Sequence, residues 1–142
     1  MSMIVLNLLS IVLLVIAAIH LLWAVGVFWP IKTEAKLARA VIGAKGIDKM
    51  PPGWASLMVA LLLTIAALWP WLTPENTALV MYHRLGFGGL IVIFGLRGIF
   101  SYLPFWRNLT PEQPFSRNDQ RYFGPLCLVI AACFAYLFQG VL

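Results

Sequence analysis

Two polar side chains stand out because they lie inside long apolar runs. Arg97 lies within residues 85–102, and His20 lies within the run that begins at Met3. An arginine near the centre of a membrane span costs about 2.5–3.5 kcal/mol on insertion scales, so such a residue usually has a partner or a function. Arg97 and His20 are therefore the first candidates for chemistry.

Arg97 requires an anionic partner, and the sequence offers few. On its side of the predicted membrane the acidic residues are Asp48, Glu112 and Asp119. Asp119 comes at the entry to the next apolar run, so an Arg97–Asp119 ion pair that joins two helices is our first interpretation. Two alternatives stay open: Arg97 binds a ligand or a lipid phosphate, or its long side chain extends to the headgroup layer.

His20 lies one helical turn before Trp23 and on the same helix face. A neutral imidazole that is hydrogen-bonded to another helix explains His20 without a function, whereas a titrating imidazole would relay protons or bind a ligand. His20 and Arg97 are expected at similar depth in the membrane. We therefore predict one polar layer, formed by His20, Trp23, Arg97 and Asp119, as the candidate ligand site.

The sequence contains no recognisable catalytic or cofactor-binding pattern. Its only histidines, His20 and His83, are expected about 20 Å apart in depth, which excludes a haem held by both. Cys127 and Cys133 point to different sides of one helix and cannot pair with each other. Metal-ligand spacings, a phosphate-binding loop and a nucleophile triad are absent from the sequence. We expect no cofactor, no metal ion and no enzymatic activity.

Membrane-spanning helices must position these residues. Of the 142 residues, 62% are hydrophobic and 11% are charged, whereas a soluble domain is about half apolar and about a quarter charged. Four apolar runs approach the length of about 20 residues that a span requires: residues 3–29, 54–71, 85–102 and 124–142. The first run is too long for the apolar part of a signal peptide, so we expect it to be retained. The sequence predicts a single-domain, all-α polytopic membrane protein with four transmembrane helices in a bundle.

The beginning of the third span is less defined than the others. A helix from residue 74 to Tyr102 would be about 45 Å long, which exceeds a hydrocarbon core of about 30 Å. Either residues 74–82 lie along the outer interface, or one tilted helix draws His83 and Arg84 inward. We prefer the interfacial arrangement.

Lysine and arginine residues predict the orientation in the membrane. The formal net charge is +5, and the basic residues lie between apolar runs, which is typical of topology signals and not of nucleic-acid binding. The first connection joins the first two apolar runs, and the third connection joins the last two. Together they contain Lys32, Lys36, Arg39, Lys45, Lys49, Arg107, Arg117 and Arg121. The opposite side contains only Arg84. We expect both basic loops in the cytoplasm and both termini in the periplasm.

The third apolar run is rich in glycine. Gly88 and Gly95 are seven residues apart and share one helix face, which Tyr102 continues. Small residues allow membrane helices to approach closely. Arg97 points nearly the opposite way, so neither face suits lipid. We expect the glycine face to pack against a neighbouring helix or to bind another copy of the chain in a dimer or a trimer.

Several short motifs follow one another along the chain. They are His20-x-x-Trp23-Ala24-x-Gly26 with Trp29-Pro30, Leu96-Arg97-Gly98, Pro114-Phe115-Ser116 with Asp119, and Tyr122-x-x-Pro125-Leu126-Cys127-Leu128. Together they resemble a widespread bacterial family of small four-helix membrane proteins known only as a domain of unknown function. The resemblance implies four helices in a bacterial inner membrane and links His20, Trp23, Arg97 and Asp119 as one set, but it implies no activity.

These observations favour a non-enzymatic inner-membrane protein that contributes to maintenance of the cell envelope. We expect it to bind lipid or another apolar ligand, either between protomers or in a cleft near His20 and Arg97. Two alternatives remain: a proton or small-ion pathway along an oligomer axis with His20 as its gate, and an accessory subunit of a larger membrane complex. Nucleic acid is not an expected partner.

Overall fold

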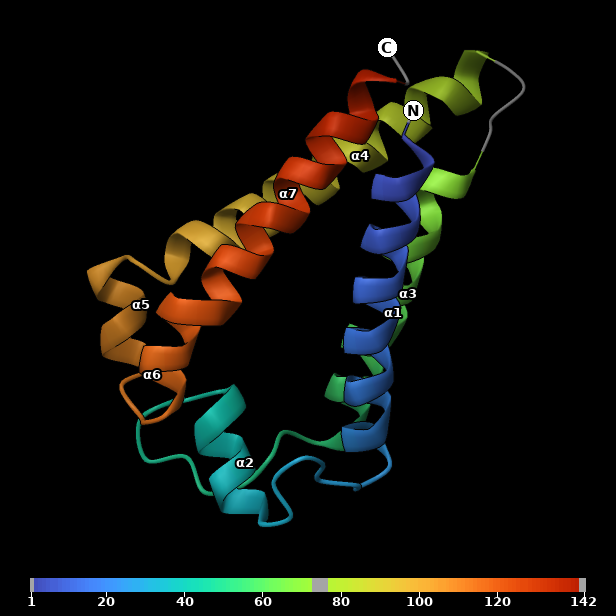
Figure 1. Cartoon of the computed structure of the whole chain (residues 1–142). Coiled ribbons are helices and arrows are strands. Elements are labelled where there is room, and N and C mark those ends of the chain that lie inside the picture. Colours follow the sequence, from blue (N-terminus) through green and yellow to red (C-terminus); the bar gives the residue numbers. More distant parts are fainter. Residues whose placement is uncertain (1, 73–76, 141–142) are drawn as a thin grey trace.

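The chain folds into four long helices and several short ones (Figure 1). The computed structural model describes residues 2–72 and 77–140. The long helices are α1 (Met3–Ala24), α3 (Gly53–Leu68), α4 (Thr77–Phe100) and α7 (Gly124–Gln139). The short elements are α2 (Glu34–Val41), η1 (Trp69–Trp71), α5 (Pro104–Leu109), α6 (Phe115–Asn118) and the π-helix η2 (Asp119–Phe123). Four described segments are long and apolar enough to cross a membrane, which confirms the predicted all-α class and its four spans.

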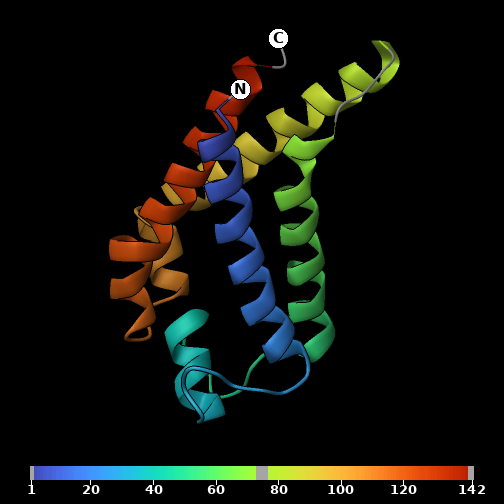
Figure 2. The same ribbon diagram turned by 45° about the vertical axis from the view of Figure 1, so that its right-hand side comes forward.

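The long helices pack as two pairs. α1 packs along α3, and α4 packs along α7, whereas the contacts between the pairs are fewer. The pairs approach each other near the two chain ends and diverge toward the opposite end, as the two orientations in Figures 1 and 2 show. The bundle is therefore formed by two helical hairpins.

A buried core joins the two pairs near the chain ends. Leu9 and Leu13 of α1 meet Phe87 of α4 and Phe134 of α7 in one apolar cluster. The Phe87 and Phe134 rings pack edge to face, with centroids 6.2 Å apart. Ser10 adds a polar contact within the first pair, because its hydroxyl donates to the Ala67 carbonyl oxygen at 2.8 Å. Hydrogen bonds of this kind help membrane helices to associate where the hydrophobic effect is absent.

Helix α4 begins before the third predicted span. Residues 77–82 continue the helix without a break, as the tilted alternative requires, and residues 74–76 lie outside the described residues. The position of this segment relative to the membrane stays a prediction. At 24 residues, α4 is about 36 Å long, and it is inclined to α1 and α3 (Figure 1). His83 is buried in the protein, where its Nε2 donates to the Trp69 carbonyl oxygen at 3.0 Å.

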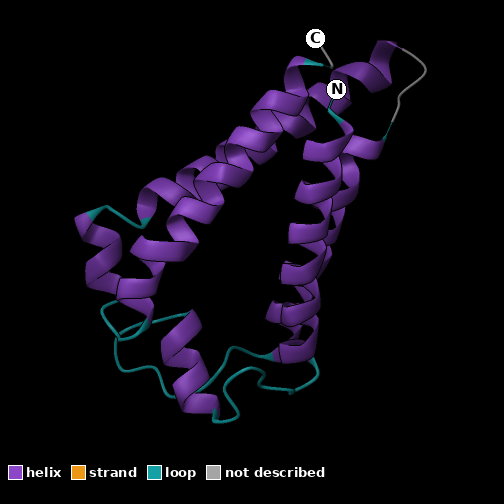
Figure 3. Cartoon of the chain, in the orientation of Figure 1, coloured by secondary structure: helices purple, strands orange, loops and turns teal. Residues whose placement is uncertain are grey.

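Most of the connecting residues gather at the end of the molecule opposite the termini (Figure 3). α2, α5 and α6 lie there, and no strand occurs within residues 2–72 and 77–140. This loop end carries the basic residues of the first and third connections.

Candidate functional site

Arg97 forms an ion pair with Asp119, as the sequence predicts. Nη2 of Arg97 lies 2.6 Å from Oδ1 of Asp119, and Nη1 donates to the Ser101 hydroxyl at 2.8 Å. The indole N–H of Trp106 donates to the other Asp119 oxygen at 3.0 Å. The guanidinium carbon also lies 5.3 Å from the centroid of the Trp106 ring, within the range of a cation–π interaction. We call Arg97, Ser101, Trp106 and Asp119 the arginine cluster.

The arginine cluster forms because α4 and α7 approach closely at glycines. A Cβ atom on Gly98 would lie 2.6 Å from Cγ of Leu128, and one on Gly124 would lie 2.8 Å from Cβ of Ser101. The π-helical turn that begins with Asp119 precedes Pro125, which lacks a backbone N–H and so cannot continue the α-helical hydrogen-bond pattern. This turn brings the Asp119 carboxylate under α4.

The geometry of the arginine cluster favours a structural role. Both carboxylate oxygens of Asp119 have donors, and the residue is only 2% exposed. A buried carboxylate that loses its partner is strongly destabilising. Through its bonds to Arg97 and Trp106, Asp119 connects the start of the fourth span to α4 and α5. The Arg97 side chain remains 32% exposed. Binding of a lipid phosphate by Arg97 stays a prediction.

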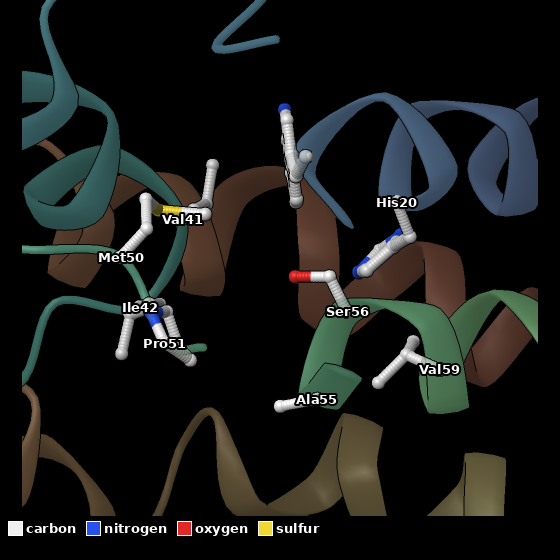
Figure 4. Close-up of a pocket in the computed structure, with 9 residues that line it drawn as sticks. His20, Val41, Ile42, Met50, Pro51, Ala55, Ser56 and Val59 are labelled. Carbon is white, nitrogen blue, oxygen red and sulfur yellow. The ribbon is translucent and has the colours of Figure 1, made fainter. Parts of the chain in front are cut away.

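His20 lines a separate cleft (Figure 4). Its Nδ1 lies 2.9 Å from the carbonyl oxygen of Ile16, one turn earlier in α1. Its ring also contacts the Trp23 ring, with centroids 4.8 Å apart, and the Trp23 indole donates to the Trp29 carbonyl oxygen at 2.7 Å. Ile16 and Trp23 thus fix the imidazole from two sides.

The cleft is small and mostly apolar. Its volume is about 170 Å³. The lining residues are His20, Trp23, Val41, Ile42, Met50, Pro51, Ala55, Ser56 and Val59. His20 and Ser56 point toward the same space in Figure 4, opposite Val41 and Met50. We call this space the histidine cleft.

The sequence analysis missed Ser56 and the wall that α2 contributes. Ser56 is a lone hydroxyl near the start of the second apolar run, at a distance from the loops similar to that of His20. The similar depth of Ser56 and His20 could have indicated that the two residues lie in one site. The α2 wall could not be found in the same way, because it depends on how two loops pack together.

Residues of the third connection hold α2 in place. Gly43, with a φ of +68°, ends the α2 region directly against the Phe115 ring. The Glu112 amide donates to the Gly43 carbonyl oxygen at 3.1 Å, and the Lys45 amide donates to the Leu109 carbonyl oxygen at 3.3 Å. One wall of the histidine cleft is therefore attached to the α4–α7 half, while α1 and α3 form the other wall.

The four residues of the predicted polar layer fall into two groups. His20 contacts Trp23, and Arg97 contacts Asp119. Within residues 2–72 and 77–140, no hydrogen bond, ion pair or ring contact joins one group to the other. A ligand role for the set stays a prediction, and the His20 group borders a cleft.

At its two glycines, the predicted oligomer face is open among the described residues. A Cβ atom on Gly88 or Gly95 would meet nothing within 4 Å. Tyr102 is exposed and donates its hydroxyl to the Gln120 carbonyl oxygen at 3.0 Å. Self-association through this face stays a prediction. The described residues also include no group of three His, Cys, Asp or Glu that could hold a metal ion.

Four apolar helices, basic loops at one end and two separate polar clusters define a small multi-pass membrane protein. Residues 13–134 match the family described as "Protein of unknown function (DUF3995)". The chain belongs to this family, which confirms the resemblance to a family known only as a domain of unknown function. No curated protein and no solved structure matches the chain.

Proposed function

We propose that this protein binds a lipid-like molecule, with an apolar body and one polar end, at the histidine cleft. The observation that carries this proposal is the convergence of His20 and Ser56 on one side of an otherwise apolar space (Figure 4). Binding sites for apolar ligands combine such a lining with a few polar groups that orient the ligand. Binding, and not catalysis, is the function that this arrangement supports.

The size of the cleft limits what enters it. Sites that enclose a drug-sized ligand measure about 300–1,000 Å³, whereas the histidine cleft measures about 170 Å³. Only the polar end of a lipid-like molecule and the adjoining carbons fit this volume. The remainder would lie in the hydrocarbon beside the helices.

The depth of the cleft agrees with a ligand whose polar end lies in the cleft and whose apolar remainder lies in the hydrocarbon. His20 lies four residues before the end of α1 at Ala24, and Ser56 lies three residues after the start of α3 at Gly53. These offsets correspond to about 6 Å along α1 and about 4.5 Å along α3. Both polar groups therefore lie near the level of lipid headgroups.

We place this end of the protein in the inner leaflet of a bacterial inner membrane. The basic residues of the first and third connections lie at the same end as the cleft, and the positive-inside rule assigns such loops to the cytoplasm. Anionic lipids of the inner leaflet attract basic segments of this kind. The ligand would then come from that leaflet.

Ser56→Leu tests the proposal, because the larger side chain fills the cleft. Native mass spectrometry of gently extracted protein should show a retained lipid-like molecule in the wild type and its loss in Ser56→Leu. Thr64→Leu is the matched control, since Thr64 lies on the same helix outside the cleft and its hydroxyl bonds only the Ala60 carbonyl oxygen. Equal retention by the three proteins would refute binding at this cleft.

A further inference from the structure

We infer that the histidine cleft selects an apolar alcohol, whose hydroxyl donates a hydrogen bond to Nε2 of His20, over the carbonyl compound with the same carbon skeleton. This inference rests on the binding function proposed above and names the chemical class of its ligand.

The contact between His20 and Ile16 determines which ring nitrogen carries the proton. A backbone carbonyl oxygen accepts hydrogen bonds and never donates them, so Nδ1, at 2.9 Å from the Ile16 oxygen, must be the N–H donor. The neutral imidazole has only one N–H. Nε2 of neutral His20 is therefore an acceptor with a free lone pair.

The free lone pair faces the cleft. Figure 4 shows the outer nitrogen of His20 pointing into the space that Ser56 borders. The one hydrogen bond of the His20 ring among the described residues is at Nδ1, so Nε2 has no partner there. Apart from Ser56, the side chains that line the cleft around Nε2 are mostly apolar and offer it no donor.

Ser56 makes the site suitable for a hydroxyl group. The Ser56 side chain is a donor as well as an acceptor, and the residue is 7% exposed. A ligand hydroxyl can donate to Nε2 of His20 while it accepts from Ser56. A ligand carbonyl can accept from Ser56 but leaves Nε2 unpaired. A charged amine would satisfy Nε2, but burying its charge in a mostly apolar cleft is costly.

The predicted preference follows from the cost of an unpaired acceptor. A site built to hydrogen-bond a hydroxyl rejects an analogue that lacks it, because its own polar group is then left without a partner. We expect an alcohol to bind about tenfold more tightly than the matching ketone.

The test compares a long-chain secondary alcohol with the methyl ketone of the same carbon skeleton. Each is added at the same mole fraction to protein in phosphatidylcholine nanodiscs at mildly alkaline pH, and the bound fraction is measured by native mass spectrometry. The alcohol should bind about tenfold more tightly. His20→Phe, which keeps an aromatic ring without the acceptor, should abolish the preference, so that the alcohol and the ketone bind equally.

The outcomes separate this inference from the binding function. If both compounds bind equally and both are lost in Ser56→Leu, the preference for a donor is wrong while the cleft still binds apolar ligands. If neither compound is retained, or if Ser56→Leu changes neither, the binding function itself is wrong. Should His20→Phe fail to fold, the alcohol-to-ketone ratio in the wild type still decides the inference.

Discussion

At Arg97, a charge inside a membrane span is accommodated by three neighbouring side chains. Asp119 neutralises the charge, Ser101 accepts a second hydrogen bond, and the Trp106 ring covers the guanidinium group. The indole of Trp106 also donates to Asp119, so the four groups form one connected network. Removing one side chain from a network of this kind lowers the stability of the protein strongly, because its partners are left unpaired.

Removal of Arg97 should therefore destabilise the protein more than removal of an exposed arginine. We expect Arg97→Met to lower the free energy of unfolding by about 3 kcal/mol, the lower end of the range for broken buried pairs, because the side chain is 32% exposed. Exposed Arg107→Met, the matched control, should change it by less than about 0.5 kcal/mol. Denaturant titration in mixed micelles, followed by circular dichroism, measures both.

A double-mutant cycle identifies the partner of Arg97. Combined with Asp119→Leu, Arg97→Met should show a coupling of about 1–3 kcal/mol, because the second substitution removes the carboxylate that the first leaves unpaired. Strictly additive effects would contradict the network.

The ion pair between Arg97 and Asp119 was predictable because the sequence offers Arg97 few acidic partners. Few acidic residues lie on the side of Arg97, and Asp119 precedes the next span. Ser101 and Trp106 were not predicted as partners, since their positions depend on the end of α4 and the short helix α5. His20 and Trp23 were predicted as neighbours from helical spacing, but Ser56 belongs to another helix, and periodicity along one helix cannot reveal it.

On the scale of elements, the glycines of α4 have two different roles. Gly86 and Gly98 face other parts of the chain, where a Cβ would overlap the Trp69 ring or Leu128. Gly88 and Gly95 face open space. The sequence indicated a glycine-rich packing helix, but it did not show which glycines pack within the chain, because that depends on the rotation of α4 relative to α7.

Alanine substitutions should distinguish these roles. Gly98→Ala should lower the free energy of unfolding by about 1–3 kcal/mol, because the added methyl group overlaps Leu128 and the Gly124 carbonyl oxygen. Gly88→Ala, the same change on the same helix, should raise it by about 0.5–1 kcal/mol through helix propensity. The same denaturant titration measures both, and a stabilising Gly98→Ala would disprove the close contact between α4 and α7.

On the scale of the whole molecule, the spans could be predicted and their arrangement could not. Apolar runs located the four spans, because hydrocarbon tolerates few charges. The pairing of α1 with α3 and of α4 with α7, and the docking of α2 against the third connection, depend on contacts between distant residues. The apolar lipid-facing surface carries no pattern that distinguishes one neighbour from another.

Cysteine labelling tests the orientation. In a background with Cys127→Ala and Cys133→Ala, we expect Lys36→Cys and Asn108→Cys to react with a membrane-impermeant maleimide only in inside-out vesicles. Ser2→Cys should react only in right-side-out vesicles, because the basic loops lie at the end opposite the N-terminus. The reverse pattern would refute a cytoplasmic position of the loops, and labelling of Lys36→Cys and Asn108→Cys from different sides would refute the fold.

The two helical hairpins also determine the order in which the cleft is completed during synthesis. The first hairpin is formed by a continuous stretch of chain, so α1 and α3 can pack before the second half leaves the ribosome. The wall that α2 contributes is held by Leu109, Glu112 and Phe115, which emerge much later. A nascent chain that ends before these residues has His20 and Ser56 in place but lacks the support for the opposite wall. A finished cleft is thus a property of the nearly complete chain.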